Sequence, residues 1–318
     1  MKKLLSLLFV LVLAMALAAC GAADEPTEEA PAADPTEEET DATEETDEDA
    51  TADYPSELVM GFVPSQDSAN IADTVAPLAD RLSEELGIPV RGEVMTNYTA
   101  TVEAMGNDQV HIGFIPAFGY VLATDRYDHI EAVLKSVRHG SSTYKAQYTV
   151  RADSDIESLE DLEGKIWALP DLTSTSGYLF PAAQLMDDYG VEDVESFFSN
   201  IIQAGGHDNA LIQVLEGDAD VATTFDDARE SIEADYPEVM EELRVLDYTD
   251  EIPNDTISVT TNLPQELIDQ IVEVFLSFND DEEMLEIMDS VYNWTGIDTA
   301  TDSDYDVVRS VSEKFDVN

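Results

Sequence analysis

Hydroxyl side chains are concentrated at one point of the sequence, the segment 171–177 (Asp-Leu-Thr-Ser-Thr-Ser-Gly). This segment follows a predicted strand that ends near Leu169 and precedes a predicted helix that runs to Tyr189, with Gly190 as its stop. A helix N-terminus offers unpaired N–H groups and the positive end of the helix dipole, and the hydroxyls add further donors. One serine or threonine suffices to cap a helix. A run of them predicts a cradle for a tetrahedral oxyanion, with plain N-capping as the alternative.

Motifs for other kinds of chemistry are missing from the sequence. There is no GxxxxGK[ST] phosphate-binding loop and no HExxH motif. The single cysteine forms neither a disulfide framework nor a thiolate metal cluster. We therefore expect no enzyme activity, no metal site and no cofactor. The four histidines are scattered along the chain, as His111, His129, His139 and His207.

The charge of the chain excludes another class of function. The 318 residues include 70 acidic and 14 basic ones, which gives a formal net charge of −56 at pH 7. Such a surface repels a phosphate backbone, so nucleic acid is not expected as a partner. A small anion must then be held by short-range N–H and O–H donors, because the long-range field does not attract it.

Alternating strands and helices position the hydroxyl segment. Their order is the βαβαβ pattern of a doubly wound parallel sheet, and a second α/β unit follows at roughly 150–250. After it, a strand at 256–260 and two helices, 264–278 and 282–292, are expected to return to the first unit. The predicted strands of the first unit are 58–63, 90–95 and 110–114, its helices are 71–86 and 99–105, and the next strand is 146–151.

We therefore predict two doubly wound α/β lobes joined by a two-strand hinge. Lobe 1 comprises residues 54–148 and 252–318, and lobe 2 comprises residues 149–251. Two α/β units joined by two crossings form a hinge that closes on a small molecule between them. Fold alone does not give function, so the function depends on the loops that face the cleft.

The N-terminus has the pattern of a secreted, lipid-anchored protein. Two lysines precede an apolar run at 4–17, which is shorter than the about 20 residues of a spanning helix. The sequence Leu-Ala-Ala-Cys-Gly at 17–21 resembles a bacterial lipobox. Residues 1–19 are thus predicted to be a lipoprotein signal peptide, and Cys20 to carry the acyl chains. The alternative is an ordinary signal peptide with an incidental cysteine. Residues 20–53 are predicted to be an acidic, disordered tether.

Seven segments follow one another along the chain. No single segment is diagnostic, but their order and spacing are. They extend over about residues 58–310. They are Leu58 to Pro64, Leu86 to Val90, Asn97 to Thr99, Gln109 to Tyr120, Ser174 to Tyr178 with Pro181, Gly206 to Ala210, and Ile252 to Asp255.

Taken together, these segments resemble the phosphate-, phosphite- and phosphonate-binding subunits of bacterial ABC importers. The resemblance implies a two-lobed, type II periplasmic-binding-protein fold and delivery of a captured oxyanion to a membrane permease. The residues that it implies for the ligand are Tyr98 and Tyr144 from lobe 1, Ser174, Thr175 and Ser176 at the helix end, and His207 from lobe 2.

Each of these residues also has an ordinary structural interpretation. Tyr98 could pack in the core, Tyr144 could lie at the rim, and His207 could be a surface or capping residue at a helix start. In aminophosphonate binders of the family, carboxylates in the second lobe and at the second hinge accept the ammonium group of the ligand. The matching segments here contain Asp226 and Asp255, although Asp226 at a strand end could equally cap a helix. His111 stands where the family usually has an acid, and we do not expect it to be a ligand.

The sequence therefore predicts an extracytoplasmic solute-binding lipoprotein on the outer face of the cytoplasmic membrane. We expect a monomer that takes a phosphonate, phosphite or related phosphorus oxyanion and docks on an ABC permease. Two alternatives stay open. One is a two-lobed binding protein for another anion, such as a sulfonate, a carboxylate or thiamine phosphate, and the other is a sensory lipoprotein without a transport role.

Salt is predicted to stabilise the folded part of the chain. Without the fifteen acids of 24–53 and the two lysines of the signal, 55 acidic and 12 basic residues remain, a formal charge of −43. Molar salt reduces the Debye length to about 3 Å and screens this repulsion. The thermal midpoint of unfolding should therefore rise between low and molar salt, as in a protein from a high-salt source. A midpoint that does not rise would contradict this prediction.

Overall fold

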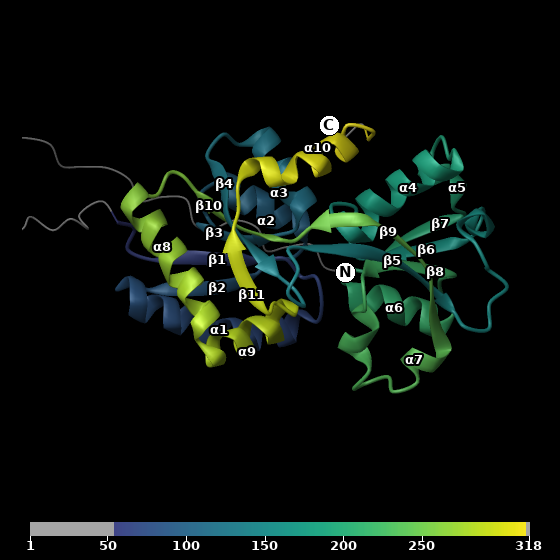
Figure 1. Cartoon of the computed structure of the whole chain (residues 1–318), viewed down its shortest axis with the longest axis horizontal. Coiled ribbons are helices and arrows are strands. Elements are labelled where there is room, and N and C mark those ends of the chain that lie inside the picture. Colours follow the sequence, from purple (N-terminus) through teal and green to yellow (C-terminus); the bar gives the residue numbers. More distant parts are fainter. Residues whose placement is uncertain (1–53, 316–318) are drawn as a thin grey trace, which may run out of the picture. The chain divides into compact units, whose positions relative to one another are not determined.

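Two mixed β-sheets and their helices make up the part of the chain that the computed structural model describes, residues 54–315 (Figure 1). The predicted signal peptide, Cys20 and the tether lie outside the described residues. None of the helices within 54–315 is long and apolar enough to cross a membrane.

The first sheet has six strands, in the order β11-β4-β10-β3-β1-β2. Strand β1 pairs in parallel with β2 and β3, and every residue of β1 and β3 is buried, as expected of strands covered on both faces. The strands are β1 (Leu58–Phe62), β2 (Val90–Val94), β3 (Ile112–Ile115), β4 (Ile130–Val137), β10 (Thr256–Thr260) and β11 (Gly296–Thr299). The helices of this part are α1 (Ser68–Leu86), α2 (Tyr98–Gly106), α3 (Ala117–Arg126), α8 (Gln265–Ser277), α9 (Glu282–Tyr292) and α10 (Asp306–Ser312).

The second sheet has five strands, in the order β7-β6-β8-β5-β9. Strand β6 pairs in parallel with β7 and β8, whereas β5 is antiparallel to both β8 and β9. Its strands are β5 (Thr143–Arg151), β6 (Ile166–Leu169), β7 (Asn200–Gln203), β8 (Val221–Phe225) and β9 (Leu243–Pro253). Its helical elements are η1 (Leu159–Leu162), η2 (Thr175–Leu179), α4 (Phe180–Tyr189), α5 (Val194–Phe197), α6 (His207–Glu216), η3 (Ala228–Ile232) and α7 (Val239–Glu242).

Local sequence explains where the helices begin and end. In α1, the side chain of Asp67 accepts a hydrogen bond from the N–H of Ala69, and Gly87 ends the helix with φ of 66°. The buried residues of α1 recur every three or four positions, which places one apolar face on the sheet. In the second sheet, Gly190 ends α4 in the same left-handed conformation, at the position predicted for the stop.

Two connections join the sheets, and this arrangement confirms the predicted fold class. Strand β4 of the first sheet continues through residues 138–142 into β5 of the second. Strand β9 continues through Asn254 and Asp255 into β10. Strand β10 runs antiparallel to β3. Its first residue, Thr256, pairs with Ile115, the last residue of β3, so the chain enters the first sheet at the carboxyl ends of the parallel strands. The lobe boundaries predicted at 148/149 and 251/252 fall inside β5 and β9.

Candidate ligand-binding site

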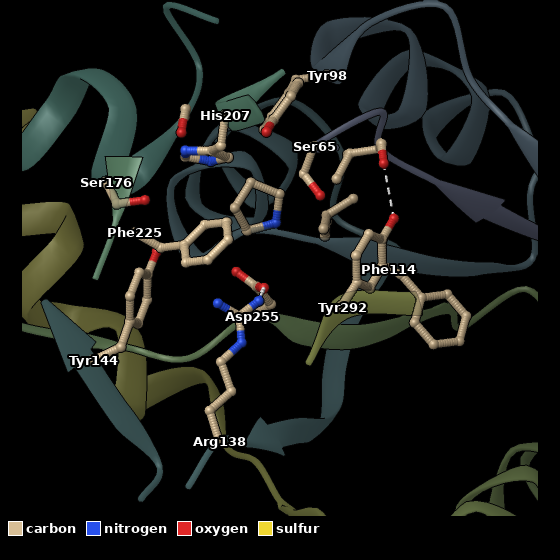
Figure 2. A pocket seen from close by; sticks show the side chains of 14 residues that line it. Ser65, Tyr98, Phe114, Arg138, Tyr144, Ser176, His207, Phe225, Asp255 and Tyr292 are labelled. Atoms are coloured by element: carbon tan, nitrogen blue, oxygen red, sulfur yellow. Dashed lines mark hydrogen bonds and ion pairs between the residues drawn. The ribbon is translucent and has the colours of Figure 1, made fainter. Parts of the chain in front are cut away.

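A small cavity lies where strands of both sheets end (Figure 2). Its walls come from the segments after β1, β3 and β6, from the ends of β8 and β4, and from the first turns of α2 and α6. This is the edge of α/β sheets at which ligands usually bind. The volume is about 20 Å³, on the scale of a single water molecule. The lining residues are Val63, Ser65, Tyr98, Phe114, Ile115, Pro116, Arg138, Tyr144, Ser174, Ser176, His207, Phe225, Asp255 and Tyr292.

The structure brings six of the eight residues proposed from the sequence into this cavity. They are Tyr98, Tyr144, Ser174, Ser176, His207 and Asp255. The other two lie elsewhere. The Thr175 side chain is fully buried and accepts a hydrogen bond from the N–H of Phe118 at 2.9 Å. Asp226 lines a second, larger cavity next to the first.

The hydroxyl segment both caps its helix and faces the cavity. The Ser174 hydroxyl accepts a hydrogen bond from the N–H of Gly177 at 3.0 Å, so it caps the π-helical turn η2. Ser174 and Ser176 are both buried and line the cavity. The Ser174 oxygen accepts from Gly177, so its own proton can still be donated, and the Ser176 hydroxyl lies within hydrogen-bonding reach of Tyr144. Gly177 is required for the close approach of this turn, because a Cβ there would lie 2.4 Å from Cγ of Pro170.

Three buried side chains at the cavity, Tyr98, Arg138 and His207, have a polar atom without a hydrogen-bond partner within residues 54–315. The Tyr98 hydroxyl and the His207 Nδ1 have none within residues 54–315, although these residues are only 3% and 4% exposed. Figure 2 shows both groups at the same end of the cavity. An unpaired buried polar group costs about 1–3 kcal/mol. A hydrogen-bonding molecule in the cavity would remove this cost.

The uncharged donors keep their protons at neutral pH. Burial, followed by the repulsion of Arg138, lowers the pKa of His207 from 6.5 to about 3, so its imidazole is neutral with one N–H. Burial, followed by the charge of Asp171, raises the pKa of the Tyr98 hydroxyl well above 10. Burial, followed by the charge of Asp255, likewise raises the pKa of the Tyr144 hydroxyl. These groups can therefore donate hydrogen bonds to an anion.

Arg138 and Asp255 form a buried ion pair at the cavity wall. Their closest nitrogen and oxygen atoms are 2.7 Å apart, and their side chains are 11% and 18% exposed. Burial raises the pKa of Asp255, and the charge of Arg138 opposes that shift. The guanidinium also lies 5.4 Å from the ring centroids of both Tyr144 and Phe225.

Hydrogen bonds to backbone groups hold this pair where the two connections between the sheets meet. The side-chain amide of Asn254, a fully buried residue, donates to the carbonyl oxygens of Ser136 and Ser141 at 2.9 Å each. The N–H of Ser136 donates to the carbonyl of Asp255 at 3.0 Å. Between Arg138 and Ser141 the chain makes a two-residue turn in which His139 and Gly140 both have positive φ, at 49° and 77°. Glycine favours such a turn.

Sequence reasoning missed Arg138. The available signal was its rarity, because it is one of only 14 basic residues, and it precedes a His-Gly turn signal between two strands. Ser65, Phe225 and Tyr292 carried no such signal. His111 does not line the cavity, and its Nδ1 accepts a hydrogen bond from the N–H of Val59 at 3.0 Å. Within residues 54–315 no group of three or more His, Cys, Asp or Glu could hold a metal ion.

The buried, neutral His207 predicts a specific pH dependence of stability. Below about pH 6.5 the unfolded chain binds a proton at this residue that the folded, ligand-free protein does not bind until about pH 3. The stability difference between the wild type and His207→Gln should therefore be constant above about pH 7. It should decrease at lower pH, towards a slope of about 1.4 kcal/mol per pH unit. Urea unfolding of both proteins between about pH 8 and about pH 5 measures this difference.

The same substitution at the exposed His139 is the control for the loss of an imidazole. A difference between the wild type and His207→Gln that does not change with pH would contradict the burial of a neutral imidazole.

Comparison with known proteins identifies relatives of the whole described part. The sequence matches the family of ABC transporter, phosphonate, periplasmic substrate-binding proteins over residues 60–305. It is 28% identical over 280 residues to the phosphate-import protein PhnD of Mycolicibacterium smegmatis, with 82% of this chain and 86% of the relative covered. It is 24% identical over 259 residues to the phosphonates-binding periplasmic protein of Escherichia coli, with 80% and 75% covered.

Solved structures share the fold. A binding protein component of an ABC phosphonate transporter from Pseudomonas aeruginosa gives a TM-score of 0.74 at 24% identity, with 82% of this chain and 86% of that chain covered. PhnD1 from Prochlorococcus marinus in complex with methylphosphonate gives a TM-score of 0.73 at 18% identity, with 82% and 98% covered. Because the family match spans more than half of the sequence, this chain belongs to the phosphonate-binding family of periplasmic substrate-binding proteins of ABC transporters.

Proposed function

We propose that this protein captures a compact phosphorus oxyanion in the cavity between its two sheets and delivers it to an ABC permease. The observation that carries the proposal is that two buried groups at the cavity, Tyr98 Oη and His207 Nδ1, have no hydrogen-bond partner among residues 54–315. The relatives named for phosphate import and for phosphonate binding support the same class of ligand. The family consists of transport proteins and not of enzymes, in line with the absence of catalytic motifs from the sequence.

The donors divide between the two sheets. Tyr98 belongs to the first sheet's side of the cavity, and Ser174, Ser176 and His207 belong to the second. Tyr144 lies on β5, directly after the connection between the sheets. Each hydrogen bond to a charged ligand contributes about 1.5–3 kcal/mol, so five such donors support tight binding after the costs of association. They act at contact distance, and the negative exterior therefore does not prevent binding.

In our proposal two contacts across the cavity stabilise a closed form of the protein. The backbone N–H of His207 donates to the carbonyl of Ser65 at 2.8 Å, and Thr175 accepts from Phe118 at 2.9 Å. Each bond joins a residue of one sheet's unit to a residue of the other. In our proposal Thr175 therefore stabilises closure, whereas Ser174 and Ser176 touch the anion. An open form would lose these two bonds. The anion favours the closed form, because only there can it pair with the donors of both sides at once.

Removal of single donors tests this site. Tyr98→Phe and His207→Gln should each weaken the binding of methylphosphonate, phosphite or phosphate by about 10- to 100-fold, because each removes one bond to a charged ligand. Isothermal titration calorimetry measures the dissociation constants. Tyr189→Phe is the matched control, because Tyr189 is exposed at the end of α4. Unchanged affinity in both cavity variants would remove these residues from the site.

Membership of this family places the protein outside the cytoplasm. In our proposal acyl chains on Cys20 anchor it to the outer face of the membrane, with residues 21–53 as a spacer. Labelled palmitate should be incorporated into the wild-type protein and not into Cys20→Ala, because the thiol is the attachment point. Absence of label from the wild type, or label that persists in the variant, would contradict the anchor.

A further inference from the structure

The cavity has one carboxylate, and that carboxylate already has a cationic partner. Among the lining residues within 54–315, Asp255 is the only Asp or Glu. Arg138 lies 2.7 Å from it, so an ammonium group that paired with Asp255 would have to share this carboxylate with the guanidinium. Figure 2 shows the guanidinium directly against the Asp255 carboxylate. No acidic side chain of the lining is left free to accept a cation.

Arg138 also separates this cavity from a larger one. Together with Tyr144 and Phe225 it lines both the small cavity and a neighbouring cavity of about 370 Å³. The two aromatic rings flank the guanidinium at 5.4 Å, and Asp255 holds its tip. The larger cavity contains the acidic side chains that the small one lacks, namely Asp226, Asp227, Glu230 and Asp289.

We propose that Arg138, through its pairing with Asp255, restricts this site to phosphorus oxyanions without a cationic tail. The inference rests on the proposed function and specifies its substrate class: phosphate, phosphite and methylphosphonate are ligands, and 2-aminoethylphosphonate is excluded. An ammonium group would lie beside a guanidinium of the same charge, with Asp255 shared between the two. Displacing Arg138 would in turn leave a buried guanidinium without its partner.

Calorimetry of the wild type with methylphosphonate and 2-aminoethylphosphonate is the first test. The aminophosphonate should bind about 100-fold more weakly, because juxtaposed like charges in a desolvated site cost several kcal/mol. If the two ligands bind within about tenfold of each other, the inference is wrong and the proposed function stands. If none of methylphosphonate, 2-aminoethylphosphonate, phosphite and phosphate binds, the proposed function is wrong, and the inference that rests on it is wrong as well.

Removing the guanidinium is the second test. In Arg138→Ala the affinity ratio of 2-aminoethylphosphonate to methylphosphonate should rise by about 100-fold, because Asp255 can then pair with the ammonium group. Propylphosphonate, which has a methyl group in place of the ammonium, should gain much less. The double variant Arg138→Ala with Asp255→Asn should lose the gain for the aminophosphonate. Equal gains for the two tails would show that Arg138 only fills space, and would overturn the proposed role of charge.

Arg91→Ala is the matched control, because it removes an arginine whose partners, Glu57 and Glu93, lie on the exposed surface. It should leave both affinities unchanged. A ratio that rises equally in Arg91→Ala would assign the effect to net charge and contradict the inference. If Arg138→Ala does not fold, Arg138→Gln, which removes the charge and keeps most of the side chain, takes its place in the same comparison.

Discussion

The buried ion pair between Arg138 and Asp255 is the interaction on which the geometry of the cleft depends. It joins the two connections between the sheets, since Arg138 follows β4 and Asp255 lies between β9 and β10. A buried ion pair is weak evidence for stability, because the desolvation of both charges offsets their attraction. In our proposal its role is in ligand specificity. Asn254 and Ser136 fix the backbone on both sides of the pair, so the two charges meet in one arrangement.

A second constraint follows from the charge of the whole chain. A protein with a formal net charge of −56 that binds an anion cannot rely on long-range attraction. The cavity meets this constraint with uncharged donors, because burial keeps the imidazole of His207 neutral and the hydroxyls of Tyr98 and Tyr144 protonated. Arg138, the one Lys or Arg among the described residues that line the cavity, is paired with Asp255. Recognition therefore depends on hydrogen-bond geometry in a desolvated space.

In our proposal the same residues connect binding with closure of the cleft. At His207 the backbone N–H bonds across to Ser65, while the side chain faces the cavity. In the hydroxyl segment the roles alternate along the chain, because Ser174 and Ser176 line the cavity and Thr175 accepts a bond from Phe118 of the other side. The end of the described chain adds a further contact, since Lys314 forms an ion pair with Asp187 of α4. In this proposal the contacts between the two sides and the full set of donors form in the same arrangement.

The sequence by itself determined the alternation of strands and helices, the fold class and the hydroxyl segment at a helix start, because periodicity, glycine stops and capping residues act over a few neighbouring positions. It also pointed to six residues that the fold places at one cavity. Only the tertiary structure decided that Thr175 contacts Phe118, that Asp226 lines a different cavity and that Arg138 neutralises Asp255. Arg138 and Asp255 are 117 residues apart in the sequence, and no local pattern encodes which distant charge a buried carboxylate will meet.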